Sequence, residues 1–177
     1  DYGSVVPSGA AHLYGSLDDA GSYTKNRFWI LEPSGEGFAI KNVANGLYLS
    51  FENGVAVTST DAVTWALTQT KGFTWTQADI DAFAAAQGLQ IPDGTYALGM
   101  DSSPRSVVDV SGGSAANGAN VQIYASNNTA AQRWVIKNTL DSDGQPTGYV
   151  TISHMGTSSS LDVSGGSRKS GANVQQY

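Results

Sequence analysis

An internal repeat constrains the fold of this 177-residue chain more than any other feature. Residues 107–124 (VVDVSGGSAANGANVQIY) and 160–177 (SLDVSGGSRKSGANVQQY) are identical at twelve of eighteen positions, with an offset of 53 residues. A stretch rich in β-branched and aromatic residues precedes each copy, at 95–98 and at 149–152. Self-similarity at a fixed period is typical of folds built from one repeated supersecondary unit, so we expect at least two equivalent units.

A third, divergent copy begins at residues 38–40. It keeps the spacing of the other two but has Ser50 where they have an aspartate, and short apolar segments follow at 55–57 and 64–67. Short alternating strands separated by Gly, Asn and Ser, four per unit in three units, predict an all-β closed architecture with pseudo-threefold symmetry.

One segment departs from the strand pattern. Residues 76–87 begin with a Thr-x-x-Asp cap and place Ile80, Phe83 and Ala84 on one face, which predicts a short helix. Because this helix falls between the first two units, we interpret residues 71–93 as a helical linker packed outside the barrel.

The charge pattern limits the partners of the chain. Only 14% of the residues are charged, and nine Lys and Arg against fifteen Asp and Glu give a formal net charge of −6. Nucleic acids and anionic membranes require clustered basic residues, so neither is an expected partner. No apolar segment has the length that membrane insertion needs, and the lack of cysteine excludes disulfides and thiolate metal sites.

Three motifs follow one another in the second unit, at residues 108–110 (VDV), 120–124 (NVQIY) and 132–134 (QRW). In this order they resemble the ricin-type β-trefoil lectins, whose repeats close with Gln-x-Trp. The resemblance is strong over residues 94–177, moderate over 24–70 and absent over the helix. It implies one domain with a β-trefoil fold of three four-stranded repeats.

The motifs also set the expected unit boundaries, with repeat one at 36–70, repeat two at 94–140 and repeat three at 148–177. Repeat three stops before any Gln-x-Trp strand, whereas Asn26-Arg27-Phe28-Trp29-Ile30 is similar to Gln132-Arg133-Trp134-Val135-Ile136. We therefore expect residues 24–35 to supply the closing strand of repeat three, with residues 24–31 paired beside residues 172–177.

One strand is represented twice, because residues 8–14 resemble residues 170–177. Either copy can fill the corresponding position, and the duplication permits a strand-swapped dimer. It also fits a segment cut from a longer multidomain chain that carries an array of such repeats.

Sugar recognition requires a carboxylate, an amide and an aromatic face. In the lectins that the chain resembles, the aspartate accepts hydrogen bonds from two vicinal hydroxyls, the aromatic ring stacks on the sugar, and the glutamine of Gln-x-Trp steadies the aspartate. The resemblance implies two sites, one with Asp109, Gln122, Tyr124 and Gln132 and the other with Asp162, Gln175, Tyr177 and Asn26.

Two departures from the family pattern affect these sites. The family often has Asn before the closing glutamine, whereas this chain has Ala131 and Lys25, so one ligand hydrogen bond is either lost or taken over by Asn127 or Asn128. Repeat one carries Ser50, Thr58 and Val63 in place of the polar set, so we expect it to be structural. We expect Trp65, Trp134 and Phe28 in the core.

The resemblance implies a non-catalytic, carbohydrate-binding module of a secreted or cell-surface bacterial protein, with galactose- or xylose-type glycans or polysaccharides as partners. No cofactor is expected. The glutamates Glu32, Glu36 and Glu52 lie in the degenerate repeat, and His12 and His154 are isolated, so neither a glycosidase pair nor a zinc site is indicated. Residues 141–144 (DSDG) open like a calcium loop but lack its later ligands, which favours a turn.

Other interpretations stay open at this stage. Asp109 and Asp162 could accept backbone N–H bonds from their Ser-Gly-Gly-Ser turns instead of meeting a ligand. Gln122 and Gln175 could lie on a solvated strand face. The whole chain could also be a structural or protein-interaction module of a larger surface protein whose sugar sites have decayed.

Overall fold

A computed structural model describes residues 25–69, 78, 81, 91–100 and 103–177. Over these residues the chain is all-β, as its short alternating segments predict, with 3-10 turns at 111–113, 130–132 and 164–166. The strands are β1 (Phe28–Ser34), β2 (Gly37–Asn42), β3 (Tyr48–Glu52), β4 (Val55–Ser59), β5 (Trp65–Gln69), β6 (Gly94–Met100), β7 (Ser103–Val110), β8 (Ala119–Ala125), β9 (Trp134–Leu140), β10 (Pro146–His154), β11 (Leu161–Val163) and β12 (Val174–Gln176).

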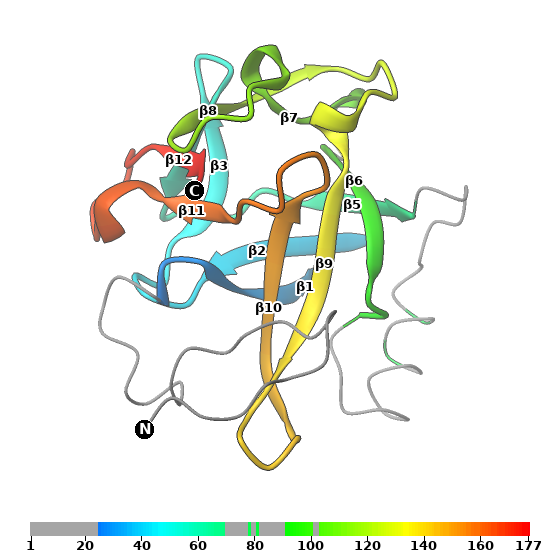
Figure 1. Cartoon of the computed structure of the whole chain (residues 1–177), viewed down its shortest axis with the longest axis vertical. Coiled ribbons are helices and arrows are strands. Elements are labelled where there is room, and N and C mark those ends of the chain that lie inside the picture. The colour runs from blue at the N-terminus through cyan, green and yellow to red at the C-terminus, as the bar shows by residue number, and fades with distance from the viewer. Residues whose placement is uncertain (1–24, 70–77, 79–80, 82–90, 101–102) are drawn as a thin grey trace.

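Six of these strands close into a ring. Going round it, β1 pairs with β10, β10 with β9, β9 with β6, β6 with β5, β5 with β2, and β2 with β1, all antiparallel. A closed ring leaves no open sheet edge, so its backbone donors and acceptors are paired with neighbouring strands. Figure 1 shows the long strands β9 and β10 running side by side along the molecule.

The remaining six strands form three hairpins, β3–β4, β7–β8 and β11–β12. Strand β8 links them, because it pairs with β4 at Val55↔Gln122 and with β12 at Asn120↔Gln175. Figure 1 shows β7 and β8 at the top of the view, beyond the ends of β9 and β10. The hairpins therefore cover one end of the barrel.

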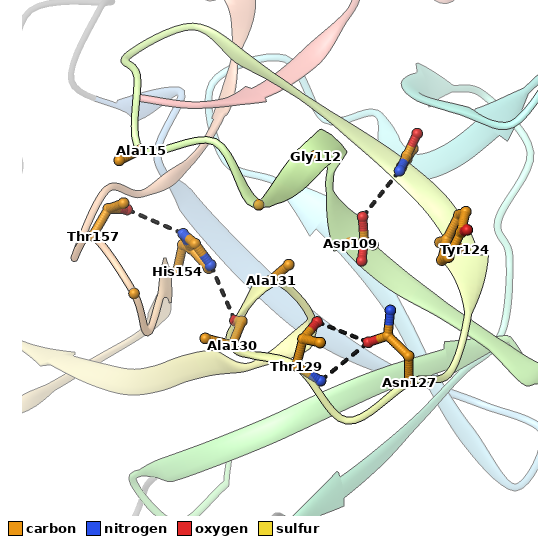
Figure 2. Close-up of a pocket in the computed structure, with 13 residues that line it drawn as sticks. Asp109, Gly112, Ala115, Tyr124, Asn127, Thr129, Ala130, Ala131, His154 and Thr157 are labelled. Atoms are coloured by element: carbon orange, nitrogen blue, oxygen red, sulfur yellow. Dashed lines mark hydrogen bonds between the residues drawn. The ribbon is translucent and has the colours of Figure 1, made fainter.

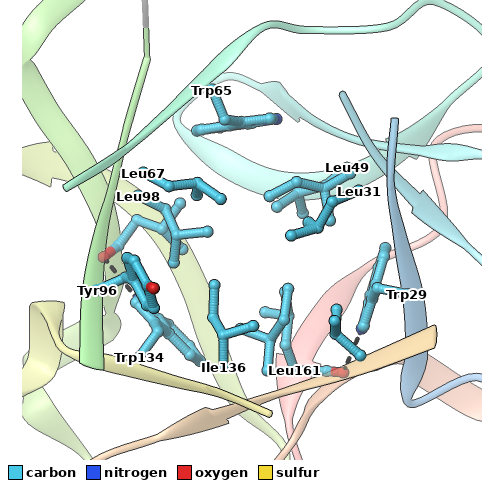
Figure 3. Close-up of a cluster of buried hydrophobic side chains, with 14 of the residues drawn as sticks. Trp29, Leu31, Leu49, Trp65, Leu67, Tyr96, Leu98, Trp134, Ile136 and Leu161 are labelled. Carbon is cyan, nitrogen blue, oxygen red and sulfur yellow. Dashed lines mark hydrogen bonds between the residues drawn. The ribbon is translucent and has the colours of Figure 1, made fainter. Parts of the chain in front are cut away.

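The core lies inside the ring and beneath the hairpins, and Figure 3 shows its tryptophans and aliphatic side chains facing one another. Trp29, Trp65 and Trp134 are fully buried, which confirms the prediction for Trp65 and Trp134. The expectation for Phe28 is wrong, because Phe28 is only partly buried and the neighbouring Trp29 enters the core instead.

The predicted pairing of residues 24–31 beside residues 172–177 is also wrong. β1 pairs with β10 at Phe28↔Thr151 and with β2 at Trp29↔Asn42, whereas β12 pairs with β11 and β8. The reason is that β1 and β10 are barrel strands, while β12 belongs to a covering hairpin. The N-terminal strand still closes the barrel, and Arg27 and Tyr177 bring the two segments into side-chain contact.

Two further predictions concern residues for which little is described. The helix expected over residues 76–87 lies outside the described residues apart from 78 and 81, and the duplicated strand at 8–14 lies outside them entirely. The other copy, at 170–177, does fill a strand position, since β12 is the hairpin partner of β11. Among the described residues, no helix is long and apolar enough to span a bilayer.

Candidate functional site

Asp109 lies near the end of β7, opposite Gln122 of β8. Its side chain is buried, and both carboxylate oxygens accept hydrogen bonds from amides: Oδ1 from Gln122 Nε2 at 3.0 Å and Oδ2 from Gln132 Nε2 at 3.1 Å. In the described part of the chain these bonds come from side chains and not from the Ser-Gly-Gly-Ser turn. Each oxygen keeps a further lone pair, so the carboxylate is oriented but not saturated.

Gln132 organises the segment that follows Tyr124. Its Nε2 also donates to the carbonyl oxygen of Ala125 at 2.9 Å, and its Oε1 accepts the backbone N–H of Asn127 at 2.8 Å. Asn127 Oδ1 in turn accepts from the backbone N–H and the hydroxyl of Thr129. A single buried amide thus holds both the carboxylate and the loop beside it.

A pocket of about 570 Å³ opens at this carboxylate, a size within the usual range of small-molecule sites. Its wall contains Asp109, Gln122 and Tyr124 from the β7–β8 hairpin, residues from 127–131, and residues from 154–157. Figure 2 shows the Asp109 side chain between the Tyr124 ring and the segment of Ala131, with Asn127 beside them. Tyr124 is 53% exposed, so the pocket combines a buried acceptor with an accessible aromatic surface.

The predicted residue Asn128 is not in the pocket wall. Its Oδ1 accepts a hydrogen bond from Arg133 Nη2 at 3.0 Å on the exposed surface. Of the two asparagines that could compensate for Ala131, it is therefore Asn127 that lines the pocket. The Asn127 Nδ2 group has no hydrogen-bond partner among the described residues, which leaves two N–H donors for a ligand.

The Ser-Gly-Gly-Ser turn shapes the rim of the pocket through its backbone. Gly112 and Gly113 have φ values of 63° and 60°, in the left-handed region that side chains disfavour. A Cβ on Gly112 would meet no atom within 4 Å. Since Gly112 also lines the pocket, its missing side chain leaves the entrance open.

His154 and Thr157 line the pocket although no motif indicated them. His154 is buried, with Nε2 at 3.0 Å from the carbonyl oxygen of Ala130 and Nδ1 at 3.1 Å from the hydroxyl of Thr157. These contacts tie the 130–132 turn to the end of β10. Within the described residues, no group of three or more His, Cys, Asp or Glu side chains could hold a metal ion.

A second constellation of the same residue types surrounds Asp162. It pairs with Gln175, whose Nε2 donates to Oδ2 at 3.3 Å, and Asn26 Nδ2 donates to Oδ1 at 2.6 Å. Burial raises the pKa of the Asp162 carboxyl, although the bonds from Gln175 and Asn26 and the charge of Arg27 act against this. The structure thus brings together Asp162, Gln175 and Asn26, and Tyr177 follows in the chain.

Arg27 is an addition that the sequence did not predict. Its Nε lies 3.5 Å from Asp162 Oδ1, and its guanidinium carbon lies 5.3 Å from the centroid of the Tyr177 ring. Tyr177 is itself 49% exposed. The carboxylate and the ring of this second constellation therefore share one arginine.

The strand register explains where Arg27 comes from. Trp29 pairs with Asn42 of β2, and Trp134 pairs with His154 of β10, so each tryptophan faces the last residue of a neighbouring barrel strand. Counting back two residues from each tryptophan places Arg27 at the same sequence offset as Gln132. By contacts, however, Asn26 takes the role of Gln132, because it is buried and its Nδ2 donates to Asp162 at 2.6 Å. The closing strand therefore has one more residue between this amide and its tryptophan.

The first hairpin has no such carboxylate. Ser50 faces Val57 across the β3–β4 ladder, in the place of the Asp–Gln pairs of the other hairpins. Thr58, another residue that stands in place of the polar set, faces Leu49, is buried, and donates to the carbonyl oxygen of Lys169 at 2.9 Å.

A closed ring of six strands covered by three hairpins defines the class of β-trefoil proteins. In agreement, the chain is similar to the crystal structure of a designed 3-fold symmetric protein, ThreeFoil, with a TM-score of 0.54 and 22% identity over 85% of this chain and 88% of that chain. At that identity the likeness concerns the fold.

The family follows from the sequence comparison. The model of the ricin-type beta-trefoil lectin domain-like family matches residues 25–124 and, in a second match, residues 83–177. The chain belongs to this family, which confirms the resemblance that its motifs indicate. A comparison with curated proteins returns no match.

Proposed function

We propose that this chain is a non-catalytic carbohydrate-binding domain that holds a sugar in the pocket at Asp109. Membership of a lectin-like family supports carbohydrate binding in general. The observation that carries the specific site is the presence, in one open pocket, of a buried carboxylate oriented by two amides and an exposed aromatic ring.

The chemistry of the pocket suits a neutral pyranose. The free lone pairs of Asp109 accept from two adjacent hydroxyls, the Nδ2 group of Asn127 donates to a ring or hydroxyl oxygen, and the apolar face of the sugar packs on Tyr124. The site is shallow and makes few hydrogen bonds, so we expect a dissociation constant on the order of millimolar, about −4 kcal/mol.

We extend the proposal to the organisation and setting of the domain. Three units, 36–70, 94–140 and 148–177 with 24–35, would each contribute one hairpin and two barrel strands. The matching ladder positions of Asp109↔Gln122 and Asp162↔Gln175 support this arrangement. The ligands would be galactose- or xylose-type glycans met by a secreted or cell-surface bacterial protein, in which this domain is one part of a longer chain.

A structural or protein-interaction module is the second candidate, and a specific observation favours it. The first hairpin has Ser50 in place of the aspartate, and Arg27 lies against Asp162. One of the three hairpins therefore has no carboxylate, and in another the carboxylate has an arginine beside it. Binding at Asp109 decides between the two functions.

Titration of residues 1–177 with galactose, N-acetylgalactosamine, mannose and xylose, followed by NMR chemical-shift changes, tests the proposal. A saturable response around Asp109 should disappear in Asp109→Ala and in Tyr124→Ala, the latter a change at an exposed ring. Asp61→Ala, at an exposed carboxylate, is the matched control and should bind normally. No response at tens of millimolar, or a response that survives both substitutions, contradicts the proposal.

A further inference from the structure

We propose that Arg27 is an internal occupant of the Asp162 site and that it determines the number of sugars the domain holds, one instead of two. This inference rests on the proposed function, because it assumes that the Asp109 pocket binds a neutral sugar. It concerns Arg27, which is not one of the aspartate, amide and aromatic residues expected in the two sites.

The position of the arginine carries the inference. One side chain reaches both Asp162, at 3.5 Å from Nε to Oδ1, and Tyr177, at 5.3 Å from the guanidinium carbon to the ring centroid. The corresponding groups of the other site, Asp109 and Tyr124, both face the open pocket. The guanidinium therefore lies between carboxylate and ring, where a sugar would place its hydroxyls and its apolar face.

The two sites differ in the residues between the amide that holds the aspartate and the tryptophan, one in the Asp109 site and two in the Asp162 site. The side chain of Gln132 ends at the amide that donates to Asp109, and the ring of Tyr124 stays exposed. At Asp162 the amide comes from Asn26. Arg27, the next residue, has a longer side chain with a charged, planar end that also reaches the carboxylate and the ring. Arg133 shows that an arginine near such a site need not enter it, since its Nη2 donates to Asn128 instead.

Electrostatics make the arginine hard for a neutral sugar to displace. Asp162 is only 2% exposed, and a sugar that moved Arg27 away would leave this carboxylate without its cationic neighbour. Removing one partner from a buried charge pair is strongly unfavourable. A sugar that must compete with the guanidinium therefore binds more weakly at Asp162 than at Asp109.

The contact is nevertheless not an optimised structural ion pair. Arg27 Nε and Asn26 Oδ1 are both buried, and neither has a hydrogen-bond partner within the described part of the chain. Buried polar atoms in a site shaped only for stability are normally satisfied. An amide in place of Arg27 would leave the Tyr177 face open, while Asn26 continues to donate to Asp162 as Gln132 does to Asp109.

The consequence for function concerns valency, the number of sugar-binding sites on the domain. Two weak sites on one domain can act together on a polysaccharide and raise the apparent affinity without any new contact. With Arg27 in place, the domain offers one site, so multivalent binding would depend on further copies or domains.

The Arg27→Gln variant of the whole chain provides the test, because it gives this strand the same Gln-x-Trp spacing as residues 132–134. In the NMR titration with whichever of the four sugars binds at Asp109, wild-type protein should shift only around Asp109. The variant should also shift saturably around Asp162, Gln175 and Tyr177, with a dissociation constant within about tenfold of the first site. The added response should vanish in Arg27→Gln/Asp162→Ala.

Arg133→Gln is the matched control and should leave one site. The response around Asp109 reports that each variant is folded. Arg27→Ala is a second variant that removes the guanidinium from the Asp162 site. A response around Asp109 in both proteins with none around Asp162 in either Arg27 variant overturns this inference alone, and so does a wild-type response around Asp162. No response at either site in any protein overturns the proposed function, and this inference with it.

Discussion

The indole N–H of Trp134 donates to the carbonyl oxygen of Val108, the residue immediately before Asp109, at 3.1 Å. Trp29 makes the same bond to Leu161, immediately before Asp162, at 3.0 Å. The tryptophans of the core thus hold the backbone from which each site carboxylate projects. Trp65 is different, since its buried Nε1 has no hydrogen-bond partner among the described residues, and its hairpin carries Ser50 instead of an aspartate.

The first prediction compares two of these tryptophans. Trp134→Phe removes the bond to Val108 and leaves a buried carbonyl unsatisfied, whereas Trp65→Phe removes an indole N–H that has no partner. Both variants lose packing, but Trp134→Phe should cost about 1–3 kcal/mol more free energy of unfolding. Urea denaturation of both variants measures this difference, and equal losses would show that the indole bond contributes nothing.

The second prediction concerns Gln132, which joins Asp109 to the loop at 125–127. Gln132→Met keeps the length of the side chain but removes its hydrogen bonds, so the carboxylate and the loop lose their common anchor. We expect at least about a tenfold loss of sugar affinity, equivalent to 1.4 kcal/mol. NMR titration measures it, with the exposed Gln145→Met as control; unchanged affinity would mean that Asp109 is oriented by Gln122 alone.

The residue types that meet at Asp109 could be predicted from the sequence, because they follow from local motifs. Asp109 and Gln122 lie on facing strands of one hairpin, and Gln132 lies at a fixed distance from its tryptophan. The pocket also includes His154, the last residue of β10, and Thr157 in the turn after it, and neither carries a motif. Their proximity depends on how β10 packs against the 130–132 turn, which no local pattern encodes.

The sequence correctly predicted that an N-terminal strand closes the barrel, but it did not predict which aromatic residue of that strand enters the core. Asn26-Arg27-Phe28-Trp29 can be aligned with Gln132-Arg133-Trp134 in two ways, and similarity of residue type favours the one that pairs Phe28 with Trp134. Burial decides otherwise, since Trp29 fills the core and forms the bond to Leu161. Asn26 still donates to Asp162 as Gln132 does to Asp109, so the chain has one more residue between amide and tryptophan, and Arg27 lies beside Asp162 as well.

The third prediction follows from the raised pKa of the Asp162 carboxyl, which burial causes. A folded-state pKa above the unfolded value means that the folded protein binds this proton more tightly than the unfolded chain does. The contribution to stability is therefore fully present below the unfolded pKa and is lost as the pH rises through the folded pKa. Wild-type protein should lose stability relative to Asp162→Asn over that window.

Urea denaturation at a series of pH values measures this dependence for wild-type protein, Asp162→Asn and the exposed control Asp143→Asn. Arg27→Gln should extend the window to higher pH, because the arginine charge lowers the pKa of Asp162. The opposite slope, with wild-type protein gaining stability over Asp162→Asn as the pH rises, would mean that the bonds from Gln175 and Asn26 outweigh burial.

The fourth prediction compares two glycines that have the same backbone conformation but lie in different surroundings. Gly112 and Gly165 have φ values of 63° and 62°, and a Cβ on either would meet no atom within 4 Å. Alanine at either position should cost about 1–2 kcal/mol of stability because of the left-handed backbone. Only Gly112 lines the Asp109 pocket, so Gly112→Ala should also weaken sugar binding there, while Gly165→Ala should bind as wild-type protein does. Equal sugar affinities for the two variants would mean that the sugar does not contact Gly112. If Gly112→Ala binds more weakly than Gly165→Ala although both lose the same stability, the loss of affinity comes from the pocket entrance and not from backbone strain.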